Sequence, residues 1–316
     1  MLSLALVGAI LAGCSRPPAE KAAVSEAPFA GRWDVTVQGK DGPYPSWFEL
    51  VPGEAGWSGR FVGRVGSARP IPTIEIQGNH LRFSLPVQYE QHKEDLWFEG
   101  TFADDRISGT TNAEDGSVLQ WTAKRAPTLE RTGEPTWGEP IDLLSGSLEE
   151  HWQPRHAEAP NRWVLQDGVL ENTERGTDLV TRRSFEDFRL HLEFKYPEGS
   201  NSGVYLRGRY EVQIQDDYGK EPSSVRIGGV YGFLTPVKNA AKPAGEWQTY
   251  DITLLGRRVT IVLNGETIVD NEEIPGITGG ALDSEEGNPG PLMLQGDHGP
   301  IAFRNVVVTP ATWAEQ

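Results

Sequence analysis

Residues 189–216 read RLHLEFKYPEGSNSGVYLRGRYEVQIQD, and their side chains alternate between two faces. Apolar and aromatic residues hold the even positions on both sides of a turn at 199–203. This period of two predicts strands with one face in a core. The other face carries planar hydrogen-bonding groups suited to a polyhydroxylated ligand such as a sugar, although a solvated sheet face is the alternative. The even set is Leu190, Leu192, Phe194, Val204, Leu206, Tyr210, Val212 and Ile214; the odd set after the turn is Tyr205, Arg207, Arg209, Glu211, Gln213 and Gln215.

The rest of the chain shows the same short alternating segments, separated by turn residues. With 36 Gly and 23 Pro among 316 residues and no long helical run, the pattern predicts an all-β protein with more than one domain. The net charge of −16, with its 29 basic residues scattered, argues against nucleic-acid binding. The sequence also lacks a basic amphipathic helix for a membrane surface.

The first 14 residues have the pattern of a bacterial export signal. Leu2 to Ala12 is an apolar run too short to span a bilayer, and Leu11-Ala12-Gly13-Cys14 resembles a lipobox. Cys14, the only cysteine, is therefore the predicted lipidation site; a plain cleaved signal is the alternative. We expect residues 15–28 to form a tether, so that the protein is exported and held at a bacterial membrane through its lipid anchor alone.

Residues 29–125 contain eight predicted strands in under a hundred residues. Tight turns join them, which predicts a small up-and-down β-barrel or half-barrel. Its tryptophans are expected in the core rather than around a ligand cavity. We assign this domain no chemistry of its own and expect it to position the second domain or extend its cleft. Residues 126–140, rich in proline and glycine, are the predicted linker.

Residues 141–310 resemble the bacterial 3-keto-disaccharide hydrolase domain, formerly a domain of unknown function. The resemblance implies a concanavalin A-like jelly roll, in which two antiparallel sheets pack face to face and the concave one holds a sugar. Asn264-Gly265 predicts a two-residue hairpin within it. Besides residues 188–219, the segments that carry the resemblance are IDLLSGSLEEHW (141–152), WVLQDGVLE (163–171), GGVYGF (228–233), GEWQTYDITLLGRRVTIVLNGETI (245–268) and GPLMLQGDHGPIAFRNVVV (290–308).

The substrate implied by this family, a glycoside oxidised at C3, permits elimination chemistry. The ketone acidifies the C2 hydrogen, a base removes it, the C1 substituent leaves, and water adds back. Glu211 and His298 are the predicted bases, and Arg207 is the predicted donor to the enolate oxygen. Tyr205 and Gln295 are auxiliary donors. A separate sugar 3-dehydrogenase or other oxidoreductase would supply the keto sugar.

Further sugar contacts are expected from side chains around the same face. Each has a structural alternative as a turn former, a core residue or a member of an ion pair. The candidates are Gln213, Asp216, Asn201, Trp247 and Glu193.

Two other functions stay open from the sequence. Residues 211–216 resemble the E-x-D-x-x-E strand of laminarinase-type glycosidases, but Gln213 replaces the central Asp and Asp216 the final Glu. A retaining mechanism needs two carboxyl groups about 5–5.5 Å apart, which this spacing disfavours. The second alternative is a non-catalytic carbohydrate-binding protein, because the same fold serves both purposes.

No cofactor is expected. The sequence contains neither an H-E-x-x-H motif nor a pair of cysteines. The acidic segment with Asp283, Glu285 and Glu286 is a weak Ca²⁺ candidate without the spacing of a known calcium loop. A solvated acidic turn is the preferred interpretation.

Overall fold

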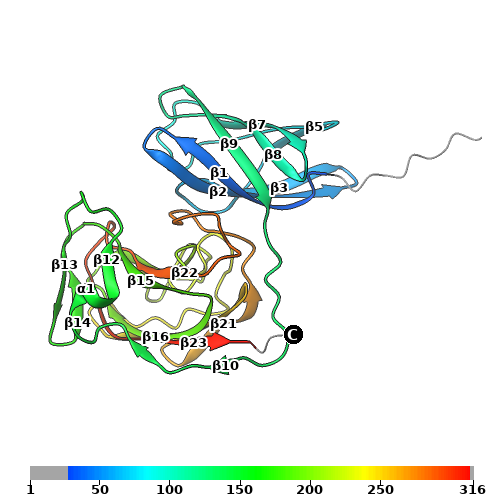
Figure 1. The fold of residues 1–316 in the computed structure, drawn as a ribbon. Coiled ribbons are helices and arrows are strands. Elements are labelled where there is room, and N and C mark those ends of the chain that lie inside the picture. Colours follow the sequence, from blue (N-terminus) through cyan, green and yellow to red (C-terminus); the bar gives the residue numbers. More distant parts are fainter. Residues whose placement is uncertain (1–27, 314–316) are drawn as a thin grey trace, which may run out of the picture.

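The computed structural model describes residues 28–313 and is almost entirely β-sheet, as predicted. Figure 1 shows two bodies joined by one extended segment. The predicted export signal and Cys14 lie outside the described residues. Within residues 28–313, no helix has both the length and the apolar character needed to cross a membrane.

The first body is a single antiparallel sheet of up-and-down strands that surrounds its own aromatic core. Pairing of the first and last strands joins its two halves, and the fourth and fifth strands form its edges. The eight predicted segments are all strands, and β4 is an additional short one. The strands are β1 (Gly31–Gly39), β2 (Gly42–Gly53), β3 (Gly56–Val62), β4 (Arg69–Pro70), β5 (Thr73–Gln77), β6 (His80–Leu85), β7 (Leu96–Ala103), β8 (Arg106–Asn112) and β9 (Val118–Arg125).

The second body is a sandwich of two antiparallel sheets, which confirms the predicted jelly-roll architecture. The larger sheet consists of β10 (Thr136–Trp137), β11 (Ile141–Asp142), β13 (Trp163–Gln166), β14 (Val169–Asn172), β16 (Asp187–Lys195), β19 (Gln248–Leu255), β20 (Arg258–Leu263), β21 (Glu266–Glu273) and β23 (Ile301–Thr312). The smaller sheet has the order β12 (Trp152–Pro154), β15 (Leu179–Phe185), β22 (Gly290–Leu294), β17 (Asn201–Leu206), β18 (Tyr210–Gln215), and a short helix α1 (Leu148–His151) precedes it.

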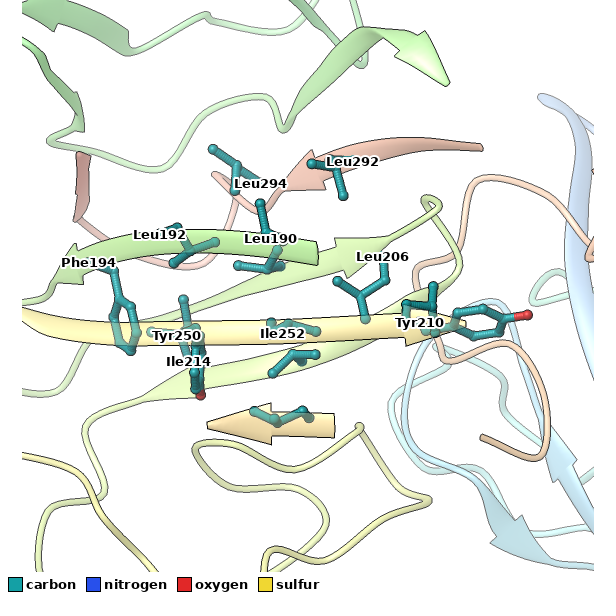
Figure 2. Packing of buried hydrophobic residues seen from close by; sticks show 14 of the residues in the cluster. Leu190, Leu192, Phe194, Leu206, Tyr210, Ile214, Tyr250, Ile252, Leu292 and Leu294 are labelled. Atoms are coloured by element: carbon teal, nitrogen blue, oxygen red, sulfur yellow. The ribbon is translucent and has the colours of Figure 1, made fainter. Parts of the chain in front are cut away.

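The core between these two sheets is made by the even-numbered residues of the alternating stretch. Figure 2 shows Leu190, Leu192 and Phe194 of β16 packed with side chains from the smaller sheet and from β19. All the even-numbered positions of the predicted set are buried in this one cluster. Their burial on one face leaves the odd-numbered face of β17 and β18 on the outside of the sandwich. The sequence pattern therefore predicted the orientation of both strands correctly.

Local turns also follow the sequence. Asn264 and Gly265 connect β20 to β21 with positive φ angles of 53° and 82°, as a type I′ hairpin requires. The predicted linker, by contrast, is not free of structure. Its residues 136–137 form β10 and pair with the end of β23, and the guanidinium of Arg189 lies 3.8 Å from the centre of the Trp137 ring. The linker thus lies along the sandwich instead of standing away from it.

The barrel packs directly against the sandwich. Trp47 of β2 is fully buried in the hydrophobic cluster of the sandwich, and its ring meets Phe233 edge to face at 5.4 Å. The backbone N–H of Gly280 donates to Arg64 O at 3.0 Å. A Cβ on Gly279 would lie 2.2 Å from Gly66 O, so the loops approach this closely because position 279 has no side chain. These contacts hold the barrel over the smaller sheet, the side on which Figure 1 shows β15 and β22.

Candidate active site

A cleft of about 870 Å³ lies between the odd-numbered face of the smaller sheet and the loops of the barrel. Its volume falls within the usual range for small-molecule sites. Among the predicted site residues, six line it: Asn201, Tyr205, Glu211, Gln213, Gln295 and His298. The structure therefore brings together most of the residues that the alternating pattern and the loop at 295–299 singled out.

Glu211 is the buried carboxyl group of this cleft. Its side chain rises from β18 opposite Tyr205 on β17, and the residue is only 4% exposed. Gly203 makes room for it, since a Cβ there would lie 2.5 Å from the Glu211 Oε1 atom. Burial raises the pKa of Glu211 to about 8, against the opposing effects of a hydrogen bond from Tyr205 and the charge of His298. A carboxyl group with such a pKa can both take and return a proton near neutral pH.

Tyr205 is a neutral hydrogen-bonding group beside this carboxyl. Its hydroxyl donates to Gly279 O at 3.0 Å and is buried with the ring. Burial and the nearby Glu211 raise the pKa of Tyr205 well above its ordinary value. The phenol thus keeps its proton at any physiological pH, and it does not act as a base.

His298 lines the cleft at an exposed position, and its Nδ1 atom is hydrogen-bonded to the carboxylate of its neighbour Asp297. The hydrogen bond to Asp297 and the charges of Asp297, Glu211 and Asp178 raise the pKa of His298, although burial opposes them. The imidazole is therefore held towards its protonated form. The cleft combines a carboxyl group of raised pKa with an imidazole whose pKa is also raised, which is a suitable pair for acid and base catalysis.

Three amide side chains supply neutral polar contacts. Gln213 is 3% exposed and its Oε1 accepts the backbone N–H of Ile214 at 3.1 Å. Gln295 Oε1 is buried and has no hydrogen-bond partner within residues 28–313. Asn201 lines the cleft at the start of β17. Because a buried acceptor without a donor is costly, a ligand hydroxyl at Gln295 would satisfy it.

The prediction that Arg207 donates to the reacting oxygen is wrong in its placement. Residues 207–209 form a three-residue turn between β17 and β18, and Arg207 has a φ of 53° there. The turn ends the alternation, so Arg207 leaves the odd-numbered face. Its guanidinium is buried away from the cleft, where Nη2 donates to Gly256 O at 2.9 Å and to the Tyr210 hydroxyl at 3.2 Å.

Three predicted sugar contacts also lie outside the cleft. Asp216 Oδ2 accepts the Gly199 N–H at 2.9 Å and so closes the turn before β17. Glu193 lies on the larger sheet, where it pairs with Arg304 at 2.6 Å. Arg304 in turn covers the ring of Trp247, with its guanidinium 4.1 Å from the ring centre. Asp216 is thus a turn former and Glu193 a member of an ion pair, whereas Trp247 is a partly buried surface ring and not the core residue of its alternative interpretation.

The acidic segment gives no support to a Ca²⁺ site. Asp283 pairs with Arg209, Glu285 with Lys124 and the buried Glu286 with Arg257, so the three carboxylates turn to three different cations. Within residues 28–313, no group of three or more His, Cys, Asp or Glu side chains is arranged to hold a metal ion. Glu286 also accepts the Tyr210 hydroxyl at 2.6 Å. The burial of Asp34 and the nearby charge of Glu286 raise the pKa of Asp34.

Several residues of the cleft escaped the sequence analysis. The buried Asp178 forms an ion pair with the partly exposed Arg155 at 3.1 Å, and the N–H of Gly296 donates to Asp178 at 2.9 Å. Burial raises the pKa of Asp178. Position 178 directly precedes β15, which neighbours β22 in the smaller sheet, so only knowledge of the strand order could have placed it beside Gln295. The barrel residues of the cleft are Asp41, Gly42, Pro43, Tyr44, Pro45, Arg64, Val65, Gly66 and Tyr89.

Comparisons with known proteins show what the second body is similar to. The profile of the family described as 3-keto-alpha-glucoside-1,2-lyase-like domain matches residues 139–309. A 3-keto-disaccharide hydrolase of Bacteroides thetaiotaomicron is 22% identical over 167 residues, which are 41% of this chain and 57% of that protein's length. A Parabacteroides distasonis structure, provisionally described as a glycosyl hydrolase, is 28% identical with a TM-score of 0.46, covering 57% of this chain and 92% of its own. A carbohydrate-binding module from Bacillus subtilis is 13% identical with a TM-score of 0.33, covering 49% and 93%.

Proposed function

The chain belongs to the family of 3-keto-alpha-glucoside-1,2-lyase-like domains, as its motifs indicated, and on that premise we propose that it cleaves glycosides oxidised at C3. The 3-keto-disaccharides named for its Bacteroides relative are the first substrates to consider. The observation that carries this proposal is the buried Glu211 carboxyl, with its pKa of about 8, in the same cleft as His298, whose pKa is also raised.

The proposed reaction begins with transfer of the C2 proton to the Glu211 carboxylate. The electrons of the C2–H bond form an enolate conjugated with the C3 ketone, and neutral donors of the cleft hydrogen-bond to its oxygen. The enolate then expels the C1 oxygen, which takes a proton from the His298 imidazolium. Water then adds to C1 of the unsaturated sugar and gives a proton to the His298 imidazole, while the Glu211 proton returns to C2. Both residues regain their starting protonation states, so hydrolysis is the sum of these steps.

This assignment of roles follows the local environments. Glu211 is a strong base once ionised, because burial disfavours its charge. The imidazole of His298 carries a proton that its Asp297 partner helps to retain. Tyr205 and Gln295 line the same cleft, and we assign both to binding the keto sugar. Tyr205 contributes a neutral phenol, and Gln295 an amide whose oxygen has no partner in the described part of the chain.

The two alternative functions receive less support. A two-carboxylate glycosidase built on residues 211 and 216 conflicts with the place of Asp216 in the turn before β17. A binding module has no use for a buried carboxyl group of raised pKa, which costs stability whenever it ionises. A catalytic base needs such a carboxyl group, so an enzyme explains why the loss of stability is tolerated.

The setting of the reaction is part of the proposal. Because the substrate must carry a ketone at C3, an oxidoreductase that acts on sugar hydroxyl groups must supply it. We further propose that the protein works after export, anchored through a lipid on Cys14.

Cleavage should depend on the ketone. We expect the protein to release glucose from 3-keto-trehalose and not from trehalose, measured by chromatography over a time course. Only the ketone makes the C2 proton acidic enough for a carboxylate base. Release from both sugars would instead indicate an ordinary glycosidase, and release from neither, with saturable binding, would indicate a binding module.

A further inference from the structure

A second cavity, of about 650 Å³, occupies the mouth of the barrel and is continuous with the catalytic cleft. The two cavities share five lining residues, Asp41, Tyr44, Arg64, Val65 and Tyr89. The barrel therefore does more than cover the sandwich. It offers a chamber that begins where the catalytic cleft ends.

Apolar and aromatic side chains form one part of the wall of this chamber, and charged residues such as Lys40, Glu90 and Asp115 form another. Phe61 and Phe98 are buried in the barrel core and line the chamber, and Leu119 of β9 joins them. The ring of Tyr44, half-buried at the junction with the cleft, faces the guanidinium of Arg64 at 5.5 Å. The apolar and aromatic part of this wall can pack against a planar aromatic group of a ligand.

Two of the polar side chains of the chamber bear on the choice of ligand. His92 lines it, and the Nδ1 atom of His92 is buried without a hydrogen-bond partner in the described part of the chain. Arg64 is an exposed cation at the junction with the cleft. A ligand with a polar substituent on its far side would satisfy His92, and a positive charge at the junction favours an oxygen that becomes negative as it leaves.

We propose that the barrel mouth holds the leaving group of the substrate, and that this leaving group is a planar aromatic alcohol. The sugar would lie in the cleft beside Glu211, and the aromatic ring would extend past Tyr44 and Arg64 towards Leu119. The chain would then act on 3-keto-glucosides of phenols. This inference rests on the proposed function, because it assigns the second half of the same substrate.

The test compares two leaving groups on one keto sugar, 4-methylumbelliferyl 3-keto-glucoside and methyl 3-keto-glucoside, each in both anomeric forms. The variant Leu119→Trp fills the chamber from a position outside the catalytic cleft. We expect it to lower kcat/KM for the umbelliferyl substrate by about tenfold or more, and that for the methyl substrate by less than about twofold.

Val118→Trp is the matched control, because the neighbouring residue of β9 is 58% exposed and points away from the barrel core. It should leave both substrates unchanged. Equal effects of Leu119→Trp on both substrates, or no effect on either, would overturn the inference. Thermal unfolding of both variants shows whether the barrel still folds. The smaller change His92→Ala should lower kcat/KM for the umbelliferyl substrate more than for the methyl substrate.

A binding measurement separates this inference from the proposed function. Free 4-methylumbelliferone should bind the wild-type protein in a fluorescence titration, with Leu119→Trp weakening the affinity about tenfold and Val118→Trp leaving it unchanged. This result would support the chamber even if no 3-keto-glucoside were cleaved, in which case the proposed function alone fails. Cleavage of the methyl substrate without any binding of umbelliferone would overturn the chamber alone.

Discussion

Replacement of Glu211 by glutamine is expected to lower kcat/KM for 3-keto-trehalose by about a thousandfold, the usual scale of a lost general base. The amide keeps the shape and hydrogen bonding of the side chain but cannot accept the C2 proton. Substrate affinity should change little, which equilibrium binding to the variant can check. Glu198→Gln is the matched control, since Glu198 is exposed in the turn before β17 and outside the cleft.

The raised pKa of Glu211 predicts two effects of pH, one on activity and one on stability. In the wild-type protein kcat/KM should rise as the pH rises towards about 8, because Glu211 becomes ionised over that range. Stability should change in the opposite direction. The folded state keeps the Glu211 proton up to about pH 8, whereas the unfolded chain loses it near the ordinary value for Glu, so stability falls between these limits. Glu211→Gln should therefore raise the unfolding temperature at pH 8. A variant that is inactive because it is unfolded, or one that retains activity, would contradict this role.

Replacement of His298 by alanine is expected to lower kcat/KM for 3-keto-trehalose by about a hundredfold, because the leaving sugar oxygen loses its proton donor. The loss should be much smaller for 4-methylumbelliferyl 3-keto-glucoside, whose phenolate leaves without protonation. His80→Ala, at an exposed position on β6, is the control for loss of a histidine.

The pH profile tests the same residue independently. Asp297 raises the pKa of His298, so the wild-type activity should fall at alkaline pH as the imidazolium loses its proton. Asp297→Asn should move that fall to lower pH, and His298→Ala should abolish it. Equal losses on both leaving groups would show that His298 does not act as the acid. If Glu211→Gln stayed active while His298→Ala lost all activity, His298 rather than Glu211 would be the base that removes the C2 proton.

The alternating segments of the sequence predicted the orientation of the strands that form the cleft. One face of β16, β17 and β18 is apolar at every even position except Ser202. Because a one-residue shift would expose all of this face, the pattern decided which side chains enter the cleft. Tyr205, Glu211 and Gln213 were located by this logic alone. Arg207 was misplaced because the alternation stops at the turn, where the chain adopts a positive φ and the side chain turns into the interior.

The remaining parts of the site depend on tertiary contacts that no local pattern contains. Asp178 reaches Gln295 only through the order of strands in the smaller sheet, and Tyr44 and Arg64 reach the cleft only because the barrel docks on the sandwich. Trp47 was expected in the core of the barrel, yet it is buried in the core of the sandwich. Aromatic residues at strand spacing predict burial, but they do not show which partner buries them.

The most direct test of the proposed mechanism is the fate of the C2 hydrogen. We would follow 3-keto-trehalose and the protein in D₂O by proton NMR, with a sample lacking protein as the control. The proposed elimination predicts deuterium at C2 of the released 3-keto-glucose, above the control, and transient signals of a 1,2-unsaturated keto sugar. Glucose release with the C2 hydrogen fully retained, and without the unsaturated sugar at any time, would contradict proton abstraction at C2.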